Sequence, residues 1–139
     1  MERRVVITGL GAITPIGKDV NESWNSILNK KCGIDNISLF DNSTFKTKVD
    51  AEVKNYESQE YFDLKQSKRL DRSSQFAMVA AREAFLDSKI TKENTDLEKV
   101  GVFVSSGIGG LTTIQNQCEI NIQKGHNRVS PMFIPMSIA

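Results

Sequence analysis

The stretch RRVVITGLGAITPIG at Arg3–Gly17 decides the class of fold. Its apolar, β-branched run Val5–Ile7 leads into the glycines of GLG, which predicts a buried parallel strand that leaves its sheet through a tight turn. A dinucleotide-binding fingerprint would need glycine or alanine at Thr14, with the next helix starting at once. Because the first credible helix begins only near Val20, a nucleotide-binding module is the less favoured interpretation of this turn.

Composition bounds the class of protein. The 139 residues are 39% hydrophobic and carry a net charge of +1, which is typical of one globular domain and indicates neither a nucleic-acid surface nor a membrane surface. No apolar run reaches the roughly 18 residues of a membrane span, and no signal peptide is evident, so we expect a cytoplasmic protein. Cys32 and Cys118 are expected to be free thiols, and together with His126 they offer no metal-ligand spacing.

Helical periodicity predicts three helices. A first helix at Val20–Asn29 has Asp19 as its cap, an apolar face that includes Trp24, and Gly33 as its terminator. A second is predicted at Arg72–Ser88. Its broad, alanine-rich face would allow a sheet or a neighbouring helix to come close. A third helix follows the GIGG turn, from Leu111 to Gln123.

Two further strands are predicted. The run VGVFVSS at residues 100–106 predicts a second buried parallel strand, and a short strand is expected around Lys48–Val53 in a surface-rich excursion. Strand, helix, strand, helix is an α/β order, but two buried strands make a poor sheet. The uncharged ending SPMFIPMSIA would begin a new element or lie in a contact surface. We therefore expect the chain to be the first part of a larger fold.

Candidate chemistry is sparse. Cys118 is interpreted as a small buried core residue, Cys32 as inert, and His126 as a solvated loop residue. The cluster LKQSKRLDR has a local charge balance of +3, and it is either a solvated face or a docking patch for an acidic partner. The turn SSGIGG is either an anion-binding nest or a turn that allows close backbone approach.

Four motifs in this order resemble the start of the β-ketoacyl-acyl carrier protein synthases, the condensing enzymes of fatty acid elongation. They are RRVVITGLGAITPIG, DRSSQFAMVAAREAF, VFVSSGIGGL and SPMFIPMSIA, and they span essentially the whole chain. The resemblance implies an α/β fold of the thiolase-like, layered α-β-α-β-α type, of which residues 1–139 would be an incomplete N-terminal half. It also implies a homodimer with no cofactor and no dinucleotide at the first glycine-rich turn.

The reaction that the resemblance implies is an acyltransferase reaction, a decarboxylative Claisen condensation. An acyl chain on an enzyme cysteine is attacked by the carbanion equivalent of malonyl-acyl carrier protein, so the implied partners are acyl carrier protein and acyl and malonyl thioesters. The family's nucleophile and two histidines would lie beyond Ala139, so no residue of this chain is predicted to be catalytic and the chain alone is expected to be inactive. The alternative is a non-catalytic partner subunit that resembles a chain-length factor.

Binding residues follow from the resemblance in two groups. A basic group would dock the acidic carrier protein. An apolar group would serve the acyl pocket, with one residue gating it and two reaching the acyl tunnel across the dimer interface. The basic group is Lys65, Lys68 and Arg69; the gate is Ile108, and the two tunnel residues are Phe133 and Ile134.

Overall fold

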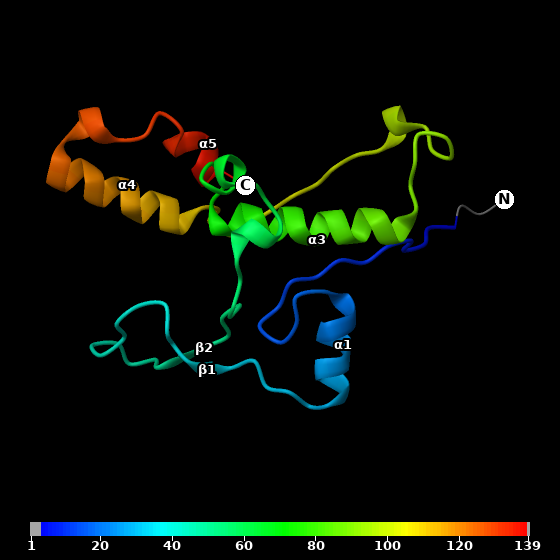
Figure 1. The fold of residues 1–139 in the computed structure, drawn as a ribbon, viewed down its shortest axis with the longest axis horizontal. Coiled ribbons are helices and arrows are strands. Elements are labelled where there is room, and N and C mark those ends of the chain that lie inside the picture. Colours follow the sequence, from blue (N-terminus) through cyan, green and yellow to red (C-terminus); the bar gives the residue numbers. More distant parts are fainter. Residues whose placement is uncertain (1–3, 139) are drawn as a thin grey trace. The chain divides into compact units, whose positions relative to one another are not determined.

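The computed structural model describes residues 4–138 and divides into two compact units. The first unit comprises residues up to Tyr56 together with Val79–Thr91, and the second comprises Glu57–Met78 and the residues from Lys92 onward. Figure 1 shows the elements, and the long helix α3 contributes to both units. In chain order the elements are α1 (Val20–Leu28), β1 (Asp35–Asn36), β2 (Val49–Asp50), η1 (Ser58–Glu60), α2 (Leu64–Ser67), α3 (Arg72–Ser88), η2 (Leu97–Lys99), α4 (Leu111–Lys124), η3 (His126–Arg128) and α5 (Phe133–Ser137).

In the first unit, the glycine-rich turn lies against the C-terminal half of α3 (Figure 1). A Cβ atom on Gly9 would overlap the carbonyl oxygen of Ala84, and one on Gly11 would overlap that of Ala80. The expectation that the alanines of this helix admit a close neighbour is confirmed, but the neighbour is the turn itself rather than a sheet or a helix.

Helix α1 begins at the predicted residue with a reciprocal cap. The Asp19 carboxylate accepts a hydrogen bond from the Glu22 amide at 2.7 Å, and the Glu22 carboxylate accepts one from the Lys18 amide at 2.8 Å. The helix ends at Leu28, and the chain turns through Lys30, whose φ of 56° is left-handed. The prediction that Gly33 ends the helix is therefore wrong: Gly33 instead packs against Pro15.

The buried face of α1 is the opposite of the expected one. Trp24 is 58% exposed, whereas Ser23 and Ser26 are buried. The Ser26 hydroxyl donates to the Ile16 carbonyl oxygen at 2.6 Å, and the Ser23 and Thr14 hydroxyl oxygens lie 2.9 Å apart. Small polar side chains hold the helix to the preceding turn, and its apolar face is left in solvent.

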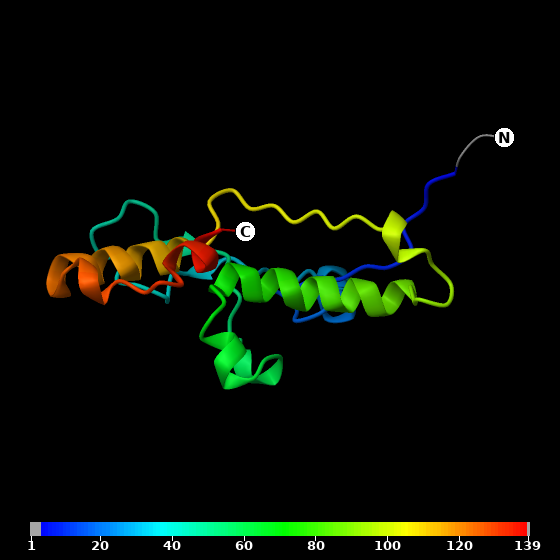
Figure 2. The same ribbon diagram turned by 90° about the horizontal axis from the view of Figure 1, so that it is seen from above.

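The two predicted buried strands are absent from the structure, and this is the largest difference from the sequence-based expectation. Residues 5–7 and 100–106 are extended but belong to no sheet, and Figure 2 shows the second of them as an extended segment between η2 and α4. Val5 is 94% exposed and Phe103 is 98% exposed. A strand is stable only when neighbouring strands satisfy its backbone groups, and residues 4–138 supply none for these two segments.

Within the described residues, the only sheet pairs β1 with β2 in antiparallel register, with Asp35 opposite Asp50. The strand expected around residues 48–53 is thus present but limited to Val49–Asp50. No hydrophobic side chain in this described part of the chain is buried. None of its helices is long and apolar enough to cross a membrane.

In the second unit, α4 starts at the predicted Leu111 and runs one residue past the predicted Gln123, to Lys124. The uncharged ending forms α5, which folds back beside the N-terminal end of α4 (Figure 2). The two helices are joined at that end by the Gly110 amide, which donates to the Ser137 carbonyl oxygen at 2.9 Å.

Candidate functional site

The most enclosed polar group of the second unit is the carboxylate of Asp71, which is only 5% exposed. One oxygen accepts hydrogen bonds from the amide and hydroxyl of Ser73, each at 3.0 Å. The other accepts from the amide of Thr113 at 3.0 Å and from its hydroxyl at 2.7 Å. One side chain thus caps the first turn of α3 and the first turn of α4 together.

The charge of Asp71 is stabilised by these donors. Burial raises the pKa of this carboxyl, but the hydrogen bonds from Thr113 and Ser73 outweigh burial, so that its pKa lies below the ordinary value. Helix N-termini favour a negative charge, and Asp71 serves two of them. Asp71 is therefore a structural anion, and both of its oxygens are occupied by donors from the first turns of α3 and α4.

The GIGG turn leads directly into α4 and lies against α5. A Cβ atom on Gly110 would stand 2.6 Å from the Met136 carbonyl oxygen and 2.9 Å from Cγ of Asp71. The Gly109 amide is bound by the Ser106 hydroxyl at 2.9 Å, and the Gly110 amide is bound by Ser137. These amides are occupied within the chain, which favours close backbone approach over an anion-binding nest as the use of this turn.

The three apolar residues assigned by resemblance to an acyl pocket lie on these joined segments. Ile108 is in the turn and is 68% exposed. Phe133 and Ile134 are in α5, where Phe133 is half-buried and Ile134 is exposed. The hydrogen bond between Gly110 and Ser137 ties the turn to that helix, so the structure brings these two segments together in one unit.

The basic residues lie on and after the short helix α2. Lys65, Lys68 and Arg69 are all exposed. Asp63 begins the helix by accepting hydrogen bonds from the amides of Lys65 and Gln66, at 2.8 and 2.7 Å. The three cationic side chains therefore stand on an ordered turn.

A side chain of α3 holds that turn in place. The Gln75 amide group is buried and donates to the carbonyl oxygens of Ser67 and Leu70, each at 3.1 Å. Arg72, counted in the basic cluster from the sequence, instead lies over the Phe76 ring with its guanidinium carbon 4.9 Å from the ring centre. Within this basic cluster, the exposed cations are therefore Lys65, Lys68 and Arg69.

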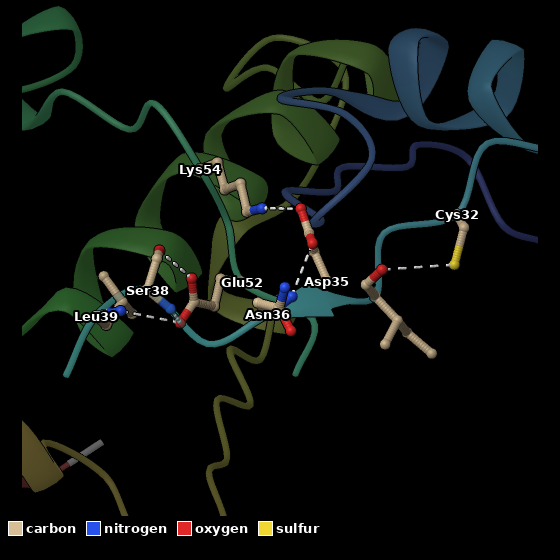
Figure 3. Close-up of polar contacts among 8 residues, drawn as sticks. Cys32, Asp35, Asn36, Ser38, Leu39, Glu52 and Lys54 are labelled. Carbon is tan, nitrogen blue, oxygen red and sulfur yellow. Dashed lines mark hydrogen bonds and ion pairs between the residues drawn. The ribbon is translucent and has the colours of Figure 1, made fainter. Parts of the chain in front are cut away.

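The two thiols and the histidine are all exposed. Cys118 is exposed, so its interpretation as a buried core residue is wrong; its side chain faces solvent because no element covers that face of α4 among the residues described. His126 is exposed, as expected. Cys32 is exposed, and its thiol donates to the Ile34 carbonyl oxygen at 3.8 Å (Figure 3).

Near Cys32 the first unit has an open polar hollow of about 320 Å³. Lys54 lines it and pairs with Asp35 at 2.6 Å (Figure 3). Beside it, Glu52 accepts hydrogen bonds from the hydroxyl and amide of Ser38 and from the amide of Leu39, at 2.6, 2.9 and 3.2 Å. These contacts hold the excursion around β1 and β2 together.

Comparison with known proteins places the chain in a family. Residues 2–139 match the family model described as beta-ketoacyl synthase, N-terminal domain. The chain belongs to the β-ketoacyl synthase family. Over 136 residues it is 40% identical to 3-oxoacyl-[acyl-carrier-protein] synthase 2 of Staphylococcus aureus (strain N315), which covers 98% of this chain and 33% of that protein. Over 138 residues it is 39% identical to the synthase 2 of Synechocystis sp. (strain ATCC 27184 / PCC 6803 / Kazusa). The chain spans about a third of the length of these curated relatives.

Solved structures show the same fold. The ishigamide ketosynthase/chain length factor superposes with a TM-score of 0.77 at 26% identity, over 100% of this chain and 35% of that one. A beta-ketoacyl synthase from Burkholderia phymatum STM815 gives 0.74 at 19% identity, over 97% of this chain and 34% of that one. The α/β, thiolase-like fold expected from the sequence is therefore confirmed at the level of the family.

Asp71 is the site residue that sequence reasoning missed. In the sequence Asp71 is the single acidic residue of the basic cluster LKQSKRLDR, and no separate role was predicted for it. An aspartate two residues before Ser73 at the start of a predicted helix is a capping signal that was available. Its second partner, Thr113, lies 42 residues away, and no local pattern predicts that contact.

Proposed function

We propose that this chain is the N-terminal part of a β-ketoacyl-acyl carrier protein synthase that elongates fatty acids by decarboxylative Claisen condensation. The proposal is supported by family membership across the chain and by curated relatives that are named 3-oxoacyl-[acyl-carrier-protein] synthase 2. Its main structural support is the hydrogen bond between Gly110 and Ser137, which joins the turn carrying Ile108 to the helix carrying Phe133 and Ile134.

In this proposal the apolar residues receive the acyl chain. Ile108 gates the entrance, where a branched side chain limits the entry of a growing chain, and Phe133 and Ile134 contribute to the tunnel across a homodimer interface. Ile108 and Ile134 are 68% and 58% exposed, so each has apolar surface available for an acyl chain or for a second subunit. Burial of that surface would stabilise the complex by the hydrophobic effect.

The basic residues receive the carrier protein. Lys65, Lys68 and Arg69 are exposed cations on an ordered turn, and an acidic partner would be steered to them by charge. A solved ketosynthase with the same fold is in complex with its acyl-carrier protein. The proposed partners are therefore acyl carrier protein and its acyl and malonyl thioesters, and the proposed setting is cytoplasmic.

The bond-making groups of the reaction lie outside residues 4–138 in this proposal. The acyl group would pass to a cysteine thiolate, and loss of CO₂ from malonyl-acyl carrier protein would supply the electron pair that forms the new carbon–carbon bond. The cysteine would then leave as the thiolate. This chain would contribute the carrier surface and the acyl gate, and alone it would be inactive.

The test begins with the reading frame that encodes this chain. The full-length gene product is purified, its intact mass is measured, and condensation is assayed by CO₂ release from malonyl-acyl carrier protein with an acyl-carrier substrate. We expect a frame that continues into a cysteine nucleophile motif and two histidines, with CO₂ release that depends on the acyl substrate. A frame that stops at Ala139, or a pure protein with no CO₂ release, overturns the proposal of catalysis.

A second candidate is a non-catalytic partner subunit. One solved relative with the same fold, at 26% identity, is a ketosynthase/chain length factor pair. The discriminating feature is the residue at the nucleophile position: cysteine favours the enzyme, and any other residue favours the partner subunit. In the second case, CO₂ release would appear only when a separate ketosynthase subunit is added.

A further inference from the structure

One carboxylate is shared by the N-terminal turns of two helices. Asp71 Oδ1 is bound by Ser73 at the start of α3, and Asp71 Oδ2 is bound by Thr113 in the first turn of α4. The N-cap position of α4 is Gly110, which has no side chain to offer as a cap. Asp71 therefore supplies from a distance the cap that the local sequence of α4 lacks.

This cap also confines the turn that carries Ile108. Gly110 is buried between Asp71 and α5, because a Cβ atom there would lie 2.9 Å from Asp71 Cγ and 2.6 Å from the Met136 carbonyl oxygen. Its amide is held by Ser137 at 2.9 Å. The C-terminal end of the turn thus has little freedom, whereas Gly107 has open space around it and Ile108 is 68% exposed. A change at Asp71 would be transmitted to Ile108 across two residues of backbone.

We infer that Asp71 is a positioning residue that sets acyl-chain preference by holding the Ile108 turn against α5. The inference rests on the proposed function, because it assigns a determinant of specificity to the proposed acyl gate. Asp71 touches no substrate in this scheme. It acts through the N-terminus of α4 and the backbone of Gly110.

A substitution of the same size can remove one of the two accepting oxygens of Asp71. Asp71→Asn keeps the size of the side chain but replaces one accepting oxygen with an amide group that only donates. Ser73 and Thr113 each present a backbone amide to Asp71, so the one oxygen of asparagine can accept from the Ser73 amide or from the Thr113 amide but not from both. The new amide group can donate only to a hydroxyl that rotates to accept it. Thr113→Val removes only the hydroxyl bond to α4, and Thr113→Ser keeps that bond.

The experiment measures kcat/KM of the full-length protein with a long-chain and a medium-chain acyl-carrier substrate. We expect Asp71→Asn to change the ratio of these two values by about tenfold, the effect of losing roughly one hydrogen bond to a charged group. Thr113→Val should change the ratio in the same direction, and Thr113→Ser should restore it. In an Ile108→Gly background, where the gating side chain is absent, Asp71→Asn should no longer change the ratio.

A merely structural role would produce a different pattern. Glu83→Gln is the matched control, because Glu83 also accepts two backbone amides, from Ala12 and Val20, each at 2.9 Å, but in the first unit. This control should lower stability and leave the ratio unchanged. If Asp71→Asn lowers both kcat/KM values equally, or changes the ratio just as much without the Ile108 side chain, the inference is wrong. If the wild-type protein does not condense at all, the proposed function fails and this inference fails with it.

Discussion

Gly11 packs so closely against Ala80 of α3 that a Cβ atom on the glycine would overlap the alanine carbonyl oxygen. The glycine-rich turn is thereby used for contact between two segments of backbone. A phosphate-binding turn would instead direct its amides toward a ligand at a helix N-terminus. In this chain the Leu10 amide donates a hydrogen bond to the Asp87 carboxylate at 3.0 Å, and the Ala12 amide donates one to the Glu83 carboxylate at 2.9 Å. The first glycines are therefore used for packing within a fold of the β-ketoacyl synthase family, and the amides beside them are bound within the chain.

The first prediction concerns this contact. We expect Gly11→Ala to destabilise the protein by about 1–3 kcal/mol, because the added methyl group meets backbone atoms that cannot rotate away. The measurement is the urea midpoint of the purified protein. Gly107→Ala is the control, since a Cβ atom at Gly107 has no neighbour within 4 Å, and it should leave the midpoint nearly unchanged. Equal effects of the two changes would contradict the packing argument.

The second prediction concerns Glu83, whose two oxygens bind the amides of Ala12 and Val20, each at 2.9 Å. Glu83→Gln leaves only one accepting oxygen, so one of the two amides loses its bond at a cost of about 1 kcal/mol. We expect faster hydrogen exchange at that amide and a lower melting temperature. Asp87→Asn should have a smaller effect, because the Asp87 bond to Leu10 is exposed. Unchanged exchange at both amides would show that the Glu83 bonds contribute nothing.

The sequence predicted well where the longer helices begin. The bounds of α3 and the start of α1 are correct because each depends on caps and periodicity within a few residues. The two predicted buried strands, at residues 5–7 and 100–106, failed for the opposite reason: a strand depends on partners distant in sequence, and the described residues contain none for them. A hydrophobic run indicates a tendency to be buried but does not provide the surface that buries it.

The difference between local and distant contacts also explains which features of the candidate site were predicted from the sequence. The exposed position of Lys65, Lys68 and Arg69 agrees with a charged helical turn, whereas the docking role proposed for them comes from motif resemblance rather than from a physical pattern. The contact of Asp71 with Thr113 was not predicted, because a polar side chain can choose among many distant donors. The ending that forms helix α5 was expected only to begin a new element or to lie in a contact surface, because Pro131 before the helix and Pro135 within it obscure a helical pattern.

The third prediction concerns pH. The hydrogen bonds from Ser38, its hydroxyl first, hold the pKa of Glu52 below its ordinary value of 4.5, and Lys54 adds a smaller contribution in the same direction. A carboxyl whose folded pKa is lowered stabilises the fold above its unfolded pKa, and this contribution is lost as the pH falls through the folded pKa. We therefore expect wild type to exceed Glu52→Gln in stability at neutral pH, with the difference shrinking below about pH 4.5.

The check is a series of urea midpoints for wild type and Glu52→Gln from neutral to acidic pH. Glu57→Gln provides the control, because Glu57 is exposed and its side chain makes no cap hydrogen bond. The control should follow wild type throughout the series. A stability gap between wild type and Glu52→Gln that widens as the pH falls would reverse the assigned sign.

The last prediction tests the carrier surface. Replacing Lys65, Lys68 and Arg69 with glutamate in the full-length protein should raise KM for a carrier-bound acyl substrate by about tenfold or more, since three attractive contacts become repulsive. The effect should weaken at high salt, which screens exposed charges. For a short acyl-pantetheine substrate, which carries no protein, kcat/KM of the variant should equal that of wild type.

The matched control reverses three exposed cations elsewhere, Lys46, Lys124 and Arg128, and so makes the same change in net charge. If the control raises KM for the carrier-bound substrate equally, the effect comes from overall charge and the α2 turn is not the docking surface. If neither variant changes KM, docking on the basic turn is excluded. Only a selective and salt-sensitive rise assigns the carrier protein to Lys65, Lys68 and Arg69.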